Sequence, residues 1–186
     1  MATNVTRVIP NIVPEVELYG DWDKVKHLLG GLDEAIAIGV DKGQLSVAKK
    51  ILAIVRKNIR ENGGSLGWPP VSYKYERWKT KKGYDPKNLL FLGGTYYRSI
   101  IIWNARGRYY VGVKRGTRNP ISKGKLTVGQ IANVLERGSE KRKIPPRPLW
   151  APSFKQFGGT KRIKEIIIWH VGNEIRNRLG VTAKVK

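Results

Sequence analysis

The sequence predicts a single α+β domain in which long helices pack on a small, mostly antiparallel sheet. Two amphipathic segments, residues 45–61 and 160–179, carry apolar residues every three or four positions, which is typical of helices with one buried face. Between them, residues 96–103 and 109–113 are predicted strands, joined by a turn at residues 104–107. Both helices are expected to pack on this hairpin. With 186 residues, 40% of them hydrophobic, the chain is long enough for one sizeable core.

The N-terminal segment differs in character from the rest of the chain. Residues 1–15 hold two prolines and scattered apolar residues without a period, so we expect an extended arm. The domain is expected to span residues 16–180, starting with a short alternating strand at residues 16–19, and residues 181–186 form a C-terminal tail. No linker or internal repeat divides this span, and one domain is therefore predicted.

Glycines are predicted to interrupt the first helical region. Asp21 is a suitable N-cap for a helix, and the pair Gly30-Gly31 is expected to break it. The helical pattern resumes at Leu32, breaks again near Gly43 and continues to about residue 61. The N-terminal third is therefore expected to contain a series of helices.

Three further segments have clear local signals. Ser72 can cap a short helix that carries Tyr75 and Trp78 on one side, with its Lys and Arg side chains pointing outward. Thr127 can cap a helix that ends at Gly138. Residues 141–152 contain four prolines and are predicted to be non-helical and stiff.

The charge is large and unevenly distributed. The net charge is +22, of which residues 56–186 carry +23 and residues 1–55 carry −1. A field of this kind attracts nucleic acid, an anionic membrane or an acidic protein surface. No apolar run exceeds about four residues, far below the ~20 of a membrane helix, and no signal peptide is apparent. We therefore expect a protein made in the cytoplasm, without a membrane partner.

The sequence offers no catalytic or metal-binding constellation. It has no cysteine, and its two histidines, His27 and His170, lack acidic residues at metal-ligand spacing. The glycine pairs at 63, 93 and 158 lack the Lys-Ser/Thr of a phosphate loop, and no Gly-x-Ser-x-Gly elbow is present. We expect neither enzymatic activity nor a cofactor.

Basic and aromatic residues are interleaved around residue 75. Tyr73, Tyr75 and Trp78 alternate with Lys74 and Arg77, a combination suited to stacking on bases and contacting phosphates. The competing interpretation is a solvated basic surface whose aromatics face the core. No helix-turn-helix, zinc-finger or RNA-recognition signature is present. A basic nucleic-acid-binding protein is nevertheless the alternative function.

Three segments, taken in order, resemble a known family. The first is a Glu-Leu-Tyr-Gly-Asp run before a long helical region, and the second is a Trp-Pro-Pro segment followed by Leu-Leu, Gly-Gly-Thr and Tyr-Arg-Ser-Ile. The third is a helix ending Leu-Glu-Arg-Gly and followed by Ile-Pro-Pro-Arg-Pro-Leu; the three lie at residues 17–21, 67–100 and 135–149. This order resembles the tail-completion, or virion-morphogenesis, proteins of tailed bacteriophages and related neck and tail-component proteins. The chain departs from the family pattern at Gly94-Thr95, which reverses the usual order, and at Leu149, which replaces Phe.

The resemblance implies a structural virion protein of the neck or tail end, which joins head to tail. It implies a homo-oligomeric ring, with hexameric symmetry, between connector and tail. The implied partners are other copies, connector or neck proteins and tail-tube or tail-terminator proteins, with unspecific contact to genomic DNA in the lumen. The implied location is the neck or tail of the virion.

Two sets of residues are candidates for these contacts. Aromatic and Arg side chains dominate interface energetics, so subunit or partner contacts are predicted at Trp68, Ile144, Arg147 and Trp150. For Trp68, packing within the domain is the alternative, and Arg147 is expected in a buried or interfacial ion pair. Contacts to a polyanion or acidic partner are predicted at Arg115, Arg118, Lys123, Lys125, Lys141, Arg142 and Lys143. Acidic protein neighbours are favoured over DNA, because a channel that grips DNA tightly would oppose ejection.

Overall fold

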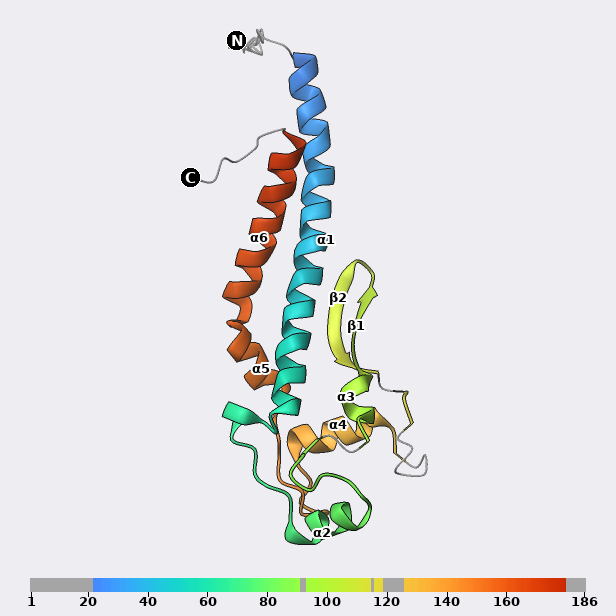
Figure 1. Cartoon of the computed structure of the whole chain (residues 1–186). Coiled ribbons are helices and arrows are strands. Elements are labelled where there is room, and N and C mark those ends of the chain that lie inside the picture. Colours follow the sequence, from blue (N-terminus) through green and yellow to red (C-terminus); the bar gives the residue numbers. More distant parts are fainter. Residues whose placement is uncertain (1–21, 91–92, 115, 119–125, 180–186) are drawn as a thin grey trace, which may run out of the picture.

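The computed structural model describes residues 22–90, 93–114, 116–118 and 126–179. Two long antiparallel helices, α1 (Trp22–Arg60) and α6 (Gly159–Arg178), form an elongated arm, and a lobe of shorter elements lies at the C-terminal end of α1 (Figure 1). The predicted α+β class is confirmed. The predicted arm at residues 1–15, the strand at residues 16–19 and the tail at residues 181–186 lie outside the described residues.

The predicted interruptions of the first helix are wrong, because α1 runs unbroken through its glycines. A Cβ atom on Gly39 would lie 2.5 Å from the Cα atom of Val171, and one on Gly43 would lie 2.9 Å from the Cα atom of Ile167. These glycines therefore let the backbone of α6 approach α1 closely. Glycine has a lower helix propensity than alanine, so each glycine also lowers the local stability of α1. We call this contact the glycine seam.

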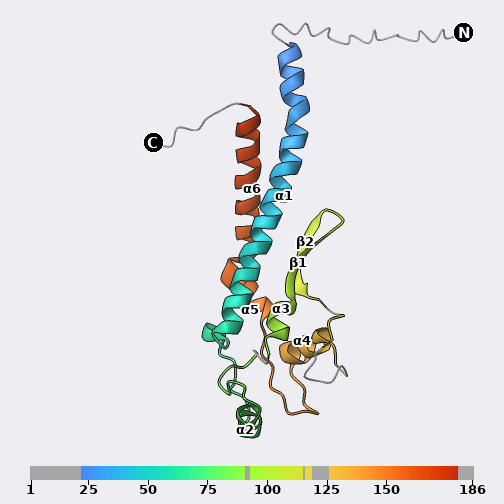
Figure 2. The same cartoon turned by 45° about the vertical axis from the view of Figure 1, so that its right-hand side comes forward.

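The hairpin consists of β1 (Ile100–Ala105) and β2 (Arg108–Val113), paired antiparallel. Its turn, Arg106-Gly107, has φ values of 53° and 71°, as a two-residue hairpin turn requires. The predicted first strand begins too early, because Thr95–Ser99 form a helical turn, α3. The expectation that both helices pack on the hairpin is correct for α1 only; α6 packs on α1 and on α5 (Trp150–Phe157) (Figure 2).

The lobe contains a 3-10 turn, η1 (Gly64–Leu66), and the helices α2 (Tyr73–Lys81) and α4 (Val128–Arg137). The predicted caps of α2 and α4 are confirmed, whereas Asp21, the predicted cap of the first helix, lies outside the described residues. The Ser72 side chain accepts a hydrogen bond from the backbone N–H of Tyr75, and Thr127 forms a reciprocal capping box with Gln130.

Two expectations about the lobe need correction. The segment 141–152 is non-helical only to residue 149, because α5 begins at Trp150 and accommodates Pro152 in its first turn, where a backbone N–H has no helical partner. Lys79 does not point outward from α2: it is 1% exposed. Its ammonium donates to the carbonyl of Asn88, and its burial lowers its pKa.

The main core lies where the arm meets the lobe. Its apolar side chains come from the last turns of α1, from the segments on either side of α2, from α3, β1 and α4, and from the residue that precedes α5. They are Val55, Ile59, Trp68, Leu90, Tyr96, Ile100, Val128 and Leu149. A second cluster of Val47, Phe157 and Ile166 joins α1, α5 and α6. None of the described helices is long and apolar enough to cross a membrane.

Candidate interaction site

Two proline-containing segments, residues 68–70 and 145–148, lie about 80 residues apart in the sequence. These two proline segments hold each other by reciprocal hydrogen bonds. The indole Nε1 of Trp68 donates to the carbonyl of Pro148 at 2.8 Å. In return, the Arg147 guanidinium donates from Nε to the carbonyl of Pro69 and from Nη2 to the carbonyl of Pro70, each at 3.1 Å. Prolines supply carbonyl acceptors but no N–H donors, so long side chains must provide the donors. We call this arrangement the proline clamp.

Arg147 is buried within the chain. Only 5% of its surface is exposed, and burial lowers its pKa. The expected ion pair is not what holds it: within the described residues its guanidinium hydrogen bonds go to backbone carbonyls. A planar guanidinium can serve two acceptors at once, which explains the choice of Arg over Lys. Trp68 packs within the domain, which was the alternative to a subunit contact: it belongs to the main core, and only 8% of its surface is exposed.

The helix α4 anchors the other end of the second proline segment. The carboxylate of Glu136 accepts hydrogen bonds from the backbone N–H groups of Leu149, at 2.8 Å, and Trp150, at 3.3 Å. These groups lie at the N-terminus of α5, where a negative charge is favourable. The segment between α4 and α5 is therefore held at its end as well as at Arg147.

Three of the predicted cationic residues lie on one tight turn. Ser139 and Ile144 pair through two backbone hydrogen bonds, of 2.8 and 2.9 Å. The residues between them include Lys141, Arg142 and Lys143, all exposed, and Lys143 has a positive φ of 51°. We call residues 139–144 the basic turn.

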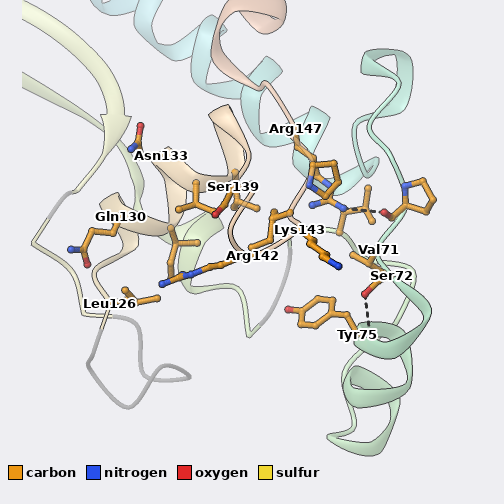
Figure 3. Close-up of a pocket in the computed structure, with 17 residues that line it drawn as sticks. Val71, Ser72, Tyr75, Leu126, Gln130, Asn133, Ser139, Arg142, Lys143 and Arg147 are labelled. Carbon is orange, nitrogen blue, oxygen red and sulfur yellow. Dashed lines mark hydrogen bonds between the residues drawn. The ribbon is translucent and has the colours of Figure 1, made fainter.

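A groove of about 990 Å³ lies between the basic turn, α4 and the segment leading into α2. Figure 3 shows Arg142 and Lys143 extending into this space from the turn and Tyr75 pointing into it from α2. Its apolar surface comes mainly from α4 and from the two proline segments: Pro70, Val71, Leu89, Leu126, Ile131, Val134, Leu135, Ile144 and Pro145. We call it the α4 groove. It can hold an extended peptide segment but contains no catalytic constellation among its described residues.

The α4 groove brings together part of the predicted site. Arg142, Lys143, Ile144 and Arg147 line it. Lys141 is exposed on the same basic turn, and Trp68 is connected to the groove through the proline clamp. These residues come from both predicted sets, the subunit contacts and the acidic-partner contacts.

The other predicted residues lie elsewhere. Trp150 lines two hollows on the side of β2, away from the groove. Arg118 is exposed and pairs with Thr127 through a single backbone bridge. Arg115, Lys123 and Lys125 lie outside the described residues.

The sequence interpretation did not identify the apolar floor of the groove, to which α4 contributes. Ile131, Val134 and Leu135 follow one another at steps of three and one, which place them on one face of α4. That spacing is visible in the sequence, but it does not distinguish a buried face from a face that lines an open groove.

A second missed feature is the apolar surface of the two-helix arm. Ile168 is 70% exposed, Trp169 is 59% exposed and Leu29 is 57% exposed. This exposure could have been predicted from the sequence. Residues 166–169 are four consecutive apolar residues, and the side chains of four consecutive residues in a helix point in different directions, so they cannot all face the core.

Comparisons with known proteins assign no family to this chain. Searches against protein-family models, curated proteins and solved structures found no match. Among the described residues, no group of three or more His, Cys, Asp or Glu side chains is placed to hold a metal ion.

Proposed function

We propose that this protein is a structural component of a bacteriophage virion, which acts at the neck or tail end without enzymatic activity. In this role it assembles into a homo-oligomeric, hexameric ring between connector and tail and joins head to tail. The observation that carries the proposal is the exposed apolar surface of the two-helix arm, together with the family resemblance of the sequence.

Several large apolar side chains of the arm are exposed to solvent. They occur on both helices and are Leu29, Ile36 and Ile38 on α1 and Ile168, Trp169 and Leu179 at or next to α6. Surfaces of this kind on a soluble protein commonly mark contacts with other proteins. In a ring, each arm would pack against the neighbouring subunit through heterologous contacts that close on themselves.

The basic turn supports the second part of the proposal, attachment to neighbouring rings. Lys141, Arg142 and Lys143 are exposed side by side, and no carboxylate among the described residues forms an ion pair with them. Acidic surfaces of connector, tail-tube or tail-terminator proteins would neutralise these charges. Genomic DNA in the lumen would make only unspecific contact.

The proposal is tested by the assembly state of the purified protein and by the particles that lack it. Mass photometry and negative-stain microscopy should show rings, and particles made without the protein should show separated heads and tails or tails with abnormal ends. The double substitution Ile168→Ser and Trp169→Ser should dissociate the rings while leaving the helix content by circular dichroism unchanged.

The matched control is Lys164→Ser, a substitution at an exposed polar position on the same helix, which should leave the rings intact. A protein that stays monomeric at all accessible concentrations and binds neither heads nor tails would contradict the proposal.

A second candidate, nucleic-acid binding, rests on one observation about α2. Tyr73 is 74% exposed, and the guanidinium carbon of Arg77 lies 5.8 Å from the centroid of its ring. An exposed aromatic ring beside cations can stack on a base. Strong preference of a monomer for one DNA or RNA sequence at physiological salt would favour this candidate over the ring. Tyr73→Ala should then weaken that binding.

A further inference from the structure

The α4 groove has a chemical character that points to a particular kind of occupant. Among the described residues that line it, none is Asp or Glu, whereas Arg142, Lys143 and Arg147 are cationic. Arg147 is already engaged by the proline clamp, which leaves the two exposed cations of the basic turn at the rim. An apolar floor with a cationic rim fits a segment that alternates apolar and acidic residues.

The chain itself contains one such segment. Residues 12–19 read Ile-Val-Pro-Glu-Val-Glu-Leu-Tyr, and they lie outside the described residues. In an extended conformation successive side chains point to opposite sides, so Pro14, Val16 and Leu18 would face one way and Glu15 and Glu17 the other. The apolar set matches the floor of the groove, and the two carboxylates match Arg142 and Lys143 at its rim.

The length of α1 decides which copy of the segment can reach the groove. The helix has 39 residues, which corresponds to about 58 Å at 1.5 Å per residue. The segment precedes the start of α1 in the sequence. Figures 1 and 2 show α2 and α4 beyond the opposite end of that helix, and these two helices contribute residues to the lining of the groove. Residues 12–21 span at most about 35 Å when fully extended. The segment therefore cannot reach the groove of its own chain.

We propose that the α4 groove binds residues 12–19 of a second copy of this chain. Each subunit donates its segment to one neighbour and accepts the segment of another, so the contact is heterologous and repeats from subunit to subunit. The inference rests on the proposed homo-oligomer and adds the structure of one of its contacts. In this contact Arg142 and Lys143 face Glu15 and Glu17 of the neighbouring subunit, and Lys141, which is exposed outside the groove lining, remains for an acidic surface of an adjacent ring. Prolines on both partners reduce the conformational entropy lost on binding.

The first experiment reverses the charges of the full-length chain. Glu15→Lys with Glu17→Lys, and separately Arg142→Glu with Lys143→Glu, should each weaken self-association by roughly 10-fold or more, because two attractive pairs become repulsive. Mixing the two variants should restore association between them. The matched control is Lys81→Glu with Lys82→Glu, which changes two exposed cations of the lobe outside the groove and should have little effect.

The second experiment uses the absence of cysteine from the natural chain. Val16→Cys in one preparation and Ile131→Cys in another should form a disulfide-linked dimer under mild oxidation when the two are mixed. Val16→Cys mixed with Asn104→Cys, a position on the exposed hairpin, serves as the control and should give little product.

The outcomes separate this inference from the proposed function. Rings that persist in both charge-reversal variants, with no cross-link between positions 16 and 131, would overturn the inference and leave the ring standing. A natural protein that is monomeric throughout would contradict both. Charge reversal of the basic turn that weakens binding of a different virion protein, again without the cross-link, would assign the groove to that protein and overturn the inference.

Discussion

The two-helix arm and the lobe are stabilised in opposite ways. In the arm, α1 and α6 approach closely at the glycine seam, where Gly39 and Gly43 leave room for the backbone of α6 at Val171 and Ile167. In the lobe, the segments around Trp68 and Arg147 are irregular and rich in proline, and long side chains donate hydrogen bonds across the gap between them.

This difference separates two kinds of tolerance to mutation. At the glycine seam, any side-chain atom added to Gly39 or Gly43 should lower the stability of the arm, whatever the polarity of the new side chain. The proline clamp should be sensitive to the loss of a donor, because the part-buried carbonyls of Pro69 and Pro70 would lose their hydrogen-bond partner. Substitutions that add volume in the arm and remove donors in the lobe therefore test the comparison directly.

The largest effect is expected from Arg147→Ala. The change leaves the carbonyls of Pro69 and Pro70 without donors and empties a buried volume, so we expect a loss of about 3 kcal/mol in the free energy of unfolding. Urea unfolding followed by the fluorescence of tryptophan, which includes the buried Trp68, measures this loss.

Arg142→Ala provides the matched control for Arg147→Ala. It removes the same side chain from an exposed position on the basic turn and should change the free energy of unfolding by less than about 0.5 kcal/mol. If Arg147→Ala were as stable as the natural protein and only assembly were lost, Arg147 would act at a subunit contact and the proline clamp would be energetically unimportant.

A smaller effect is expected from Gly39→Ala in the arm. The new methyl group would meet the backbone of Val171, so α6 must shift, at a cost of about 2 kcal/mol. The thermal midpoint followed by far-ultraviolet circular dichroism should fall.

Gly30→Ala is the matched control for the glycine seam. Gly30 lies in the same helix, but a Cβ atom there would have nothing within 4 Å, so the higher helix propensity of alanine should raise stability by about 0.5–1 kcal/mol. Equal effects of the two substitutions would mean that the seam does not limit the approach of α6.

Much of the fold is predictable from local sequence signals, and the errors occur where tertiary contact overrides local preference. The caps at Ser72 and Thr127 depend on residues three positions away, and the sequence predicts both correctly. The glycines of α1 resemble breaks because glycine disfavours helix locally. Their role depends on α6, more than 120 residues later in the sequence, and no local pattern contains that information.

The candidate site is predictable in its charge but not in its geometry. Composition identifies Lys141, Arg142 and Lys143 as a cationic group, and they are exposed together on one turn. Arg147 is equally basic in the sequence, yet it is buried among proline carbonyls contributed by a segment almost 80 residues away. Hydrogen bonds over such a separation depend on the packed fold, which composition does not reveal.

The smallest effect concerns the junction between arm and lobe, where Tyr96 is 7% exposed in the main core. Burial raises the pKa of its phenol well above the ordinary value of 10, and the nearby Glu136 carboxylate raises it further. The folded protein therefore keeps a proton that the unfolded chain releases above pH 10. The resulting stability is fully present below pH 10 and is lost as the pH rises beyond it.

Tyr96→Phe removes this titration and should change stability little at pH 8. The difference in free energy of unfolding between the natural protein and the variant should stay constant up to about pH 9 and then shift in favour of the variant. Urea unfolding at intervals from pH 8 to pH 11 measures that difference. Circular dichroism reports mainly on the long helices of the arm, and tryptophan fluorescence reports on Trp68 and Trp78 in the lobe as well as on Trp169 in the arm. Because Tyr96 packs against the last turns of α1 as well as the lobe, both signals should show the same shift. A shift confined to one signal would mean that arm and lobe unfold separately, and a difference that stays constant to pH 11 would mean that the Tyr96 phenol is not protected by the core.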